Sequence, residues 1–275
     1  MSTSFAHQRG PLLIGVIRKE TMREALAEMR NAQYHGAEAY DLHLSCLREE
    51  SRTKEEIRRA VEFTDKPVMA LYYRDARDEI TEEARAGCLA EAVDGGAACV
   101  DMQAYTFDPA AKEGFDPAFG AGLPFAAAMP REISMRPEIV EKQMRWIAEM
   151  HKRGAEVLIS CHTGVSMVAE QTVSLAKELE RRGADIVKIV GMANTPEEQI
   201  EAFGTVYALK KALKAKFSYH CNGKYGKLTR IVNPMLGSYL MFCVDRFDGA
   251  YALEQLDLKT AADAMRTLDW RQKET

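Results

Sequence analysis

Short runs of apolar residues alternate with longer amphipathic segments along almost the whole chain. The short runs carry aliphatic side chains at successive positions, which is typical of strands that are buried on both faces of a parallel sheet. The longer segments repeat apolar residues every three or four positions, which is typical of helices that cover such a sheet. The expected strands are 12–18, 37–44, 67–73, 98–104, 156–161, 185–190, 216–220 and 240–244; the expected helices are 21–34, 53–63, 81–93, 138–152, 165–181, 196–213, one after 229, and 258–268.

Eight strand–helix repeats in 275 residues predict an α/β fold, a single (β/α)8 TIM barrel domain that spans residues 1–275. Gly-Ala pairs such as Gly183-Ala184 separate helical from strand-like segments, and glycine often ends a helix. A doubly wound open sheet is the alternative fold, but no Gly-x-Gly-x-x-Gly turn follows the first expected strand. The stretch 105–136, which follows the fourth strand and is rich in Pro, Gly and Phe, is expected to be a packed excursion at the catalytic face.

Lys188 is the most unusual position, because it interrupts the apolar run 184–190. Burying an unpaired ammonium is costly, so a lysine in such a strand either has a partner or is held as a neutral amine. A neutral amine can attack a carbonyl and form a Schiff base. A lysine at a strand end that reaches solvent is the alternative that this position alone leaves open.

Polar side chains also stand at the expected carboxyl ends of other strands, where the catalytic groups of a barrel lie. Strand residues two apart face the same side, so several of these groups are expected to converge on one mouth. A histidine there can exchange protons in both directions near neutral pH. The residues are Asp41, His43, Arg74, Asp101, Gln103, His162, His220 and Asn222, and Arg74 and Arg230 are the cations expected near Lys188.

Charge and composition exclude several function classes. The net charge of −4 and the lack of a long basic run argue against a nucleic-acid partner. No apolar stretch approaches 18 residues, and residues 1–9 lack the apolar core of a signal peptide, so we expect no membrane partner. The six cysteines are scattered without a Cys-x-x-Cys pair, which indicates reduced thiols in a cytoplasmic protein.

Several segments between about residues 12 and 265 together resemble the type I 3-dehydroquinate dehydratase family. Residues 183–189 resemble the family's Schiff-base lysine strand, and 158–162 resemble the strand that ends in its proton-transferring histidine. Residues 66–74 resemble the strand that ends in an active-site arginine. Residues 226–230 resemble the segment whose arginine binds the substrate carboxylate, and 254–256 fall where the family has a lid glutamine, here Gln255.

Other positions depart from the family pattern. The second strand, usually Glu-x-Arg-x-Asp, here carries Asp41, His43 and Ser45. Gln103 stands where the fourth strand usually has a glutamate. The methionines of the seventh strand are absent from the region that contains His220 and Asn222, and Tyr251 stands where the family has a lid serine.

The resemblance implies the loss of water from a cyclic β-hydroxy ketone acid, with 3-dehydroquinate to 3-dehydroshikimate as the family reaction. Lys188 would form the imine and His162 would move the protons, without a cofactor or a metal. Arg230 and Gln255 would bind the substrate, and Arg74 would pair with Asp41. The pocket wall would include His43, Gln103, Asn222 and Tyr251. The expected partner is a small-molecule keto acid, and the resemblance also implies a homodimer.

Three other functions stay open at this point. The altered pocket positions allow the same imine chemistry on another polyhydroxy keto substrate. Carboxylates and imidazoles on several strands allow a metal-dependent lyase or isomerase, although no close ligand spacing supports it. A non-catalytic ligand-binding barrel is the third. Cys161 beside His162 suggests a thiol nucleophile, but alternation along the strand predicts that Cys161 packs against the helices.

Overall fold

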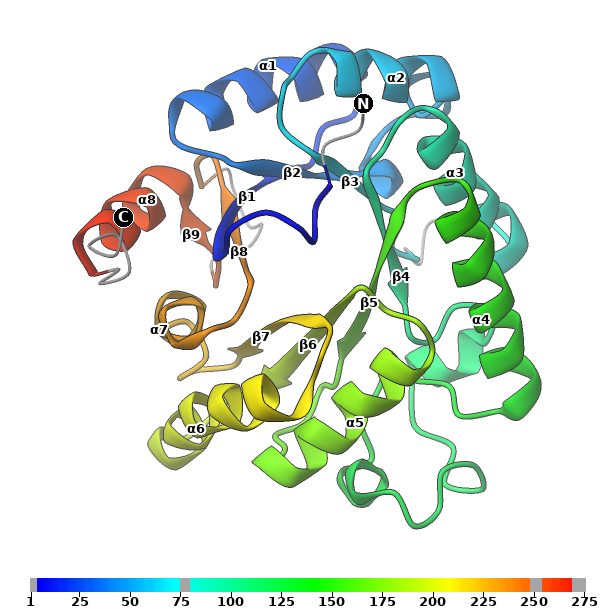
Figure 1. The fold of residues 1–275 in the computed structure, drawn as a ribbon, viewed down its shortest axis with the longest axis vertical. Coiled ribbons are helices and arrows are strands. Elements are labelled where there is room, and N and C mark those ends of the chain that lie inside the picture. The colour runs from blue at the N-terminus through cyan, green and yellow to red at the C-terminus, as the bar shows by residue number, and fades with distance from the viewer. Residues whose placement is uncertain (1–3, 75–79, 248–253, 269–275) are drawn as a thin grey trace.

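Eight parallel strands curl into a barrel in the computed structural model, which describes residues 4–74, 80–247 and 254–268 (Figure 1). Hydrogen-bonded neighbours follow the order β7-β6-β5-β4-β3-β2-β1-β8, and a short β9 pairs with β8. The ring closes between β7 and β8, where the backbone N–H of Tyr239 donates to the carbonyl of Phe217 (2.6 Å). The strands are β1 Leu12–Ile17, β2 Ala39–His43, β3 Val68–Leu71, β4 Cys99–Gln103, β5 Glu156–His162, β6 Ile186–Met192, β7 Lys216–Asn222, β8 Leu240–Val244 and β9 Leu256–Asp257.

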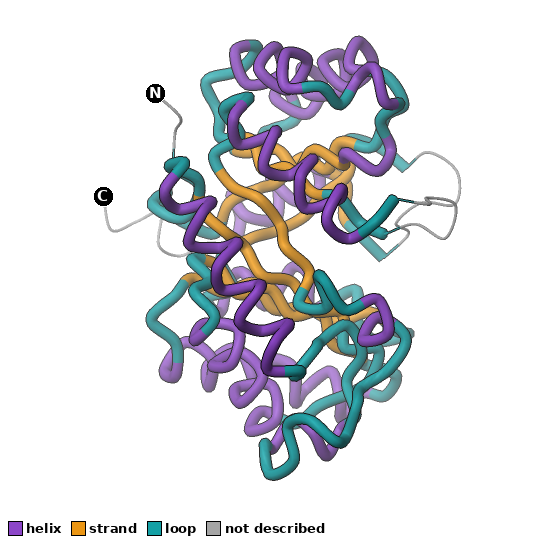
Figure 2. The backbone as a smooth tube through the Cα atoms, turned by 90° about the vertical axis from the view of Figure 1, so that its right-hand side faces the viewer, coloured by secondary structure: helices purple, strands orange, loops and turns teal. Residues whose placement is uncertain are grey.

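Helices lie outside the strands and alternate with them along the chain (Figures 1 and 2). The predicted (β/α)8 barrel is therefore confirmed, with element bounds close to those expected. Among the described residues, no helix has both the length and the apolar composition to cross a membrane. The helices are α1 Met22–Tyr34, α2 Lys54–Glu62, α3 Glu82–Asp94, α4 Pro137–Lys152, α5 Ala169–Arg181, α6 Pro196–Ala212, α7 Thr229–Leu236 and α8 Leu258–Leu268.

Local sequence signals fix where several helices begin and end. Threonine side chains cap α1, α2, α3 and α6 by accepting a hydrogen bond from a backbone N–H in the first helical turn. Gly183 follows α5 with a φ of +106°, a left-handed conformation that glycine adopts without steric cost. Its position lets the chain turn directly from α5 into β6, the strand that carries Lys188.

The interior of the barrel is divided into an apolar end and a polar end. Near the amino ends of the strands, alternate residues such as Ile14, Met69, Leu158 and Ile186 form a buried apolar cluster that includes Phe5. Near the carboxyl ends, the inward positions carry polar and charged groups instead. The alternation of side chains along each strand therefore directs the ionisable groups of several strands toward one mouth.

The opposite side of each strand packs against the helices in a second, larger cluster. Cys161 belongs to this outer cluster and is fully buried, as the alternation along β5 predicted. Burial raises the pKa of its thiol well above the ordinary value, with the charge of Glu132 acting in the same direction. The thiol nucleophile interpretation is therefore not supported, because a nucleophile needs the thiolate form and access to substrate.

The excursion between β4 and α4 is a packed structure that includes the short 3-10 helices η3 Pro109–Lys112 and η4 Pro124–Ala128. Its aromatic side chains anchor it: Phe125 is fully buried and meets Phe115 edge to face at 6.0 Å between ring centroids. The excursion, green in Figure 1, runs beside α5 and returns to the mouth of the barrel near β5.

A buried arginine ties this excursion to the helices behind it. Arg182, which follows α5, is 1% exposed. Its guanidinium pairs with Glu178 (2.9 Å) and donates to Gln143 Oε1 (2.7 Å) and to the carbonyl of Ser134 (2.8 Å). One planar fork of donors thus satisfies acceptors from α5, α4 and the excursion.

Replacing Arg182 by methionine should lower the free energy of unfolding by about 3–5 kcal/mol, because Glu178 and several acceptors lose a buried donor. The matched control is Arg181→Met, since Arg181 pairs with the same Glu178 but its side chain is 55% exposed. The control should cost less than about 1 kcal/mol. Urea unfolding followed by circular dichroism measures both, and equal effects would contradict the structural role assigned to Arg182.

Candidate active site

A cavity of about 210 Å³ opens at the carboxyl ends of the strands. It is densely charged for its size. Arg18, Lys188 and Arg230 contribute cations, and Asp41 and Glu254 contribute carboxylates. Imidazoles from β2, β5 and β7 line the same space. A concave site with several convergent ionisable groups is the usual form of an enzyme active site.

Most of the residues predicted from sequence meet in this cavity. Arg74, Asp101 and Gln103 are not part of the lining, and Tyr251 lies outside the described residues, so its place stays a prediction. The predicted residues that line the cavity are Asp41, His43, His162, Lys188, His220, Asn222, Arg230 and Gln255.

Lys188 is held inside the barrel by a carboxylate. It is 5% exposed, so the alternative of a lysine that reaches solvent is excluded. Its Nζ pairs with Asp101 Oδ2 on β4 (3.2 Å), and Ser160 on β5 donates to the other oxygen of the same carboxylate (2.5 Å). The ring centroid of Phe242 lies 4.5 Å from Nζ. Of the two possibilities considered for a buried lysine, the structure therefore shows the partner, and that partner is Asp101.

His162 is held at both ring nitrogens. Its Nδ1 lies 2.8 Å from Glu132 Oε2, and its Nε2 lies 2.9 Å from the hydroxyl of Tyr73. Burial and neighbouring carboxylates raise the pKa of Tyr73 well above its ordinary value, so its phenol keeps its proton beside Nε2. Because the Glu132 carboxylate can only accept, Nδ1 carries a proton and donates it to Glu132, while Nε2 faces the Tyr73 hydroxyl.

Glu132 is an anion in this arrangement. Burial raises the pKa of its carboxyl, but the hydrogen bonds from His162 and the charge of that imidazole outweigh burial and hold the pKa below the ordinary value. The residue comes from the end of the excursion rather than from a strand. The excursion therefore supplies the group that orients the histidine.

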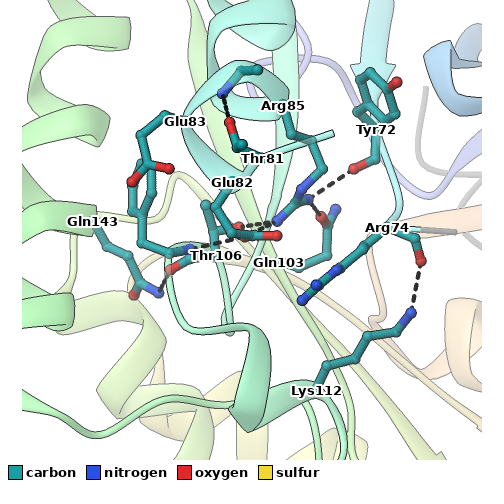
Figure 3. Close-up of polar contacts among 12 residues, drawn as sticks. Tyr72, Arg74, Thr81, Glu82, Glu83, Arg85, Gln103, Thr106, Lys112 and Gln143 are labelled. Atoms are coloured by element: carbon teal, nitrogen blue, oxygen red, sulfur yellow. Dashed lines mark hydrogen bonds and ion pairs between the residues drawn. The ribbon is translucent and has the colours of Figure 1, made fainter. Parts of the chain in front are cut away.

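Gln103 is withdrawn from the cavity by an arginine of α3. Arg85 is 1% exposed and donates to Gln103 Oε1, to Glu82 (2.5 Å) and to the carbonyl of Tyr72 (2.8 Å), as Figure 3 shows. The amide nitrogen of Gln103 turns back toward the backbone carbonyl of Asp101 (3.1 Å). With both ends of its amide engaged inside the protein, Gln103 is not placed to contact a ligand in the cavity.

Arg74 does not form the predicted ion pair with Asp41. Its described contact is through the backbone carbonyl, which accepts a hydrogen bond from Lys112 (2.7 Å; Figure 3). Asp41 instead pairs with His43 Nε2 (3.1 Å). Tyr73 takes the inward position at this end of the third strand, because it continues the alternation of Met69 and Leu71.

The two histidines at the back of the cavity are kept neutral by burial. Burial lowers the pKa of His43, although the Asp41 carboxylate opposes this. Burial lowers the pKa of His220 well below 6.5, and the charges of Arg230, Lys188 and His162 add to the effect. The pKa of Asp41 is lowered, because His43 and nearby cations outweigh the opposite effect of burial. The cavity thus keeps its imidazoles neutral at the back and its carboxylate charged.

Within the described residues, no group of three or more His, Cys, Asp or Glu side chains is arranged to hold a metal ion. Asp41 pairs with His43, Asp101 with Lys188 and His162 with Glu132, so these candidate ligands are engaged with other partners. The metal-dependent alternative therefore lacks a ligand set in this part of the chain.

The sequence matches the model of a known enzyme family over the part of the chain that carries most of the cavity residues. The family model described as type I 3-dehydroquinase matches residues 129–271, which is more than half of the chain. The chain belongs to the type I 3-dehydroquinase family. The matched region contains His162, Lys188, Arg230 and Gln255, whose resemblance to family residues was inferred from the sequence.

Two curated relatives of the family are similar over part of their lengths. The 3-dehydroquinate dehydratase of Desulfotalea psychrophila is 28% identical over 170 residues, which is 59% of this chain and 58% of that protein. The enzyme of the same name from Alkaliphilus oremlandii is 35% identical over 94 residues, which is 34% of this chain and 37% of that protein. The matched segments therefore span less than two thirds of either relative.

Solved structures of the type I 3-dehydroquinase family share the fold over nearly the full chain. The 3-dehydroquinate dehydratase of Geobacillus kaustophilus superposes with a TM-score of 0.69 at 16% identity, covering 96% of this chain and 94% of the other. The type I enzyme of Clostridium difficile gives a TM-score of 0.71 at 15% identity, covering 94% and 92%. At these identities the likeness shows the barrel alone.

Three residues of the site were missed by sequence reasoning. Arg18 and Tyr73 could have been found, because both continue the inward alternation of their strands. Glu132 had no comparable signal. It lies 30 residues before His162 in an irregular segment, and only the path of the excursion brings the two together.

Stability should depend on pH through His220. In the unfolded chain a histidine titrates near pH 6.5, whereas the folded protein keeps this imidazole neutral to much lower pH. Below about pH 6.5 the unfolded state therefore binds a proton that the folded state does not, and stability falls with pH by at most about 1.4 kcal/mol per unit. Between pH 7 and 5.5, His220→Asn should lose about 1 kcal/mol less than the unsubstituted protein in urea unfolding. Parallel pH curves for the two proteins would contradict this assignment.

Proposed function

We propose that this protein dehydrates 3-dehydroquinate to 3-dehydroshikimate through an imine on Lys188. The observation that carries the proposal is the placement of three groups in one cavity. A buried lysine amine, an imidazole oriented by Glu132 and a guanidinium all face the same space. These are the groups that imine formation, proton transfer and carboxylate binding require.

The first step joins Lys188 to the substrate. His162 accepts a proton from the Lys188 amine, which adds to the ring ketone, and the imidazolium then returns that proton to the former carbonyl oxygen, which leaves as water and so leaves a carbon–nitrogen double bond with a positively charged nitrogen. Asp101, 3.2 Å from Nζ, lies where its carboxylate can balance that charge. The neighbouring C–H becomes more acidic, because the iminium withdraws the electrons of the breaking bond.

His162 then moves the proton. The substrate would replace the Tyr73 hydroxyl at Nε2, which takes the proton from the acidified carbon. The resulting imidazolium returns that proton to the hydroxyl on the next carbon, which leaves as water. Glu132 supports the positive charge on the ring from Nδ1 (2.8 Å). Addition of water to the conjugated imine releases the product and the lysine, so the net change is the loss of one water from the substrate.

Arg230 and Gln255 would bind the substrate carboxylate. Arg230 is 7% exposed at the start of α7, and Asn222 holds its Nη2 (2.7 Å), which fixes the direction of the guanidinium. Its Nε and Gln255 Oε1 are buried without a hydrogen-bond partner among the described residues. A substrate that presents a carboxylate and hydroxyl groups would satisfy both.

Relatives support the reaction, since both curated proteins are named 3-dehydroquinate dehydratase. The Clostridium difficile protein was solved with a covalently modified comenic acid, which supports covalent chemistry on this fold. By the same resemblance we expect a cytoplasmic homodimer. His43, His220 and Asn222 alter the cavity wall relative to the family pattern, and on this ground another polyhydroxy keto acid is the second candidate substrate.

Borohydride reduction tests the imine directly. With 3-dehydroquinate present, the intact protein should gain the mass of one reduced adduct, and peptide mapping should place it on Lys188. Lys188→Met should form no adduct. Lys216→Met, which removes an exposed lysine at the start of the neighbouring β7, should label normally. An unlabelled protein would refute the proposal for this substrate, and a panel of keto acids under the same conditions would test the alternative.

Glu132→Gln tests the orientation of His162. Removal of general acid–base catalysis typically costs about 10²–10⁴-fold, so loss of the orienting carboxylate should lower kcat by about tenfold or more with little change in KM. Glu113→Gln, an exposed carboxylate of the same excursion, is the matched control and should retain activity. A Glu132→Gln variant with unchanged kcat, or with a lower thermal midpoint that accounts for the loss, would remove Glu132 from this role.

A further inference from the structure

Arg18 is a charged residue of the cavity to which the reaction above gives no task. It follows β1 directly and continues the inward alternation of Leu12, Ile14 and Val16. The register pairs Ile17 of β1 with Leu42 of β2, so the next position brings Arg18 level with His43. β1 lies between β2 and β8 (Figure 1), so Arg18 enters the cavity beside the pair of Asp41 and His43.

Several polar atoms of the cavity lack partners around this point. In the part of the chain that the structure describes, Arg18 Nε, Arg230 Nε, Asp41 Oδ1 and Gln255 Oε1 are buried without a hydrogen bond. All four belong to residues that line the cavity, and Asp41 and Arg230 are only 2% and 7% exposed. Buried polar atoms are usually satisfied, so four exceptions in one space indicate a ligand that completes them.

The two unpartnered guanidinium nitrogens define the chemistry of that ligand. A guanidinium only donates hydrogen bonds, so the ligand must offer acceptors to both arginines. The two cations also act on each other. Burial is the main cause that lowers the pKa of Arg230 to about 10, and the charge of Arg18 adds to it while Glu254 opposes it. An anion between the two arginines would remove this repulsion.

We propose that Arg18 binds the substrate carboxylate together with Arg230, which makes it a second carboxylate-binding arginine of this site. The inference rests on the proposed function for the identity of the substrate. It explains why the second strand can carry His43 where the family pattern has an arginine, because Arg18 supplies a guanidinium at the same level from the adjacent strand. The ligand class is a polyhydroxylated ring acid whose carboxylate lies between the first strand and α7.

Quinate and its carboxamide provide the test, because neither has a ketone and neither can form an imine. Isothermal titration calorimetry on the full-length protein gives both dissociation constants. Hydrogen bonds to charged groups are worth about 1.5–3 kcal/mol, so Arg18→Gln should weaken quinate binding by roughly 10–100-fold. The carboxamide should bind both proteins within about twofold, because it offers no negative charge to lose.

Two further variants control the result. Arg18→Lys keeps the charge without the planar fork and should recover part of the lost affinity, which also covers the case in which Arg18→Gln folds poorly. Lys19→Gln removes the neighbouring charge, which pairs with Glu28 (2.7 Å) and does not line the cavity, and should bind quinate normally. Equal weakening of quinate and the carboxamide, unchanged quinate binding in Arg18→Gln, or no binding of quinate by the unsubstituted protein would each overturn the inference.

The outcome separates this inference from the proposed reaction. Normal borohydride labelling of Lys188 with no role of Arg18 in quinate binding would reject only the second arginine. A selective loss of quinate binding in Arg18→Gln without any adduct from 3-dehydroquinate would reject only the reaction.

Discussion

The rest of the site depends on the contact between Lys188 and Asp101. An amine inside a barrel requires compensation, and the carboxylate of Asp101, itself fully buried, provides it from two strands away. Ser160, from the strand between them, satisfies the second carboxylate oxygen. Parallel register places Ser160 level with Lys188, so the three groups form one buried unit across β4, β5 and β6. This unit fixes the amine at the cavity, and under the proposed reaction the same carboxylate would balance the charge of the iminium.

The excursion supplies a group of the site that the strands do not provide, the carboxylate that orients His162. The barrel places His162 at the mouth, but its ring orientation is set by Glu132, and Glu132 is fixed by a segment that packs on Phe125 and is tied down by Arg182. A carboxylate at the end of an unsupported loop would orient an imidazole poorly, because each loose dihedral would weaken the hydrogen bond. The buried guanidinium of Arg182 therefore affects the chemistry through the geometry of a segment that it touches at Ser134, two residues from Glu132.

Sequence reasoning reached the barrel and much of its mouth because both follow from period-two alternation. Lys188, His162 and Asp41 are inward residues near strand ends, and their place in the cavity follows from the fold. Gln103 shows the limit of that rule: its position on β4 is correct, but Arg85 from α3 binds its amide and turns it away. Arg74 shows another limit of predicting inward residues by alternation. The inward residue at this end of the third strand is Tyr73, one position before Arg74. Contacts made by irregular segments, or by long side chains from helices, follow no sequence periodicity and so could not be predicted from the alternation along the strands.

The two arginines of the cavity are destabilising neighbours that an anionic ligand would stabilise. Arg18 and Arg230 bring like charges into one small space, and each leaves a buried donor unused. Such a site lowers the stability of the folded protein, and a bound anion that uses both donors stabilises it in proportion to its affinity. Lys188 is already paired with the carboxylate of Asp101, so in the proposed site the anion would pair with the two arginines rather than with the amine. Under that proposal the substrate carboxylate would lie against the arginines, and the ketone of the same ring would remain available to the amine of Lys188.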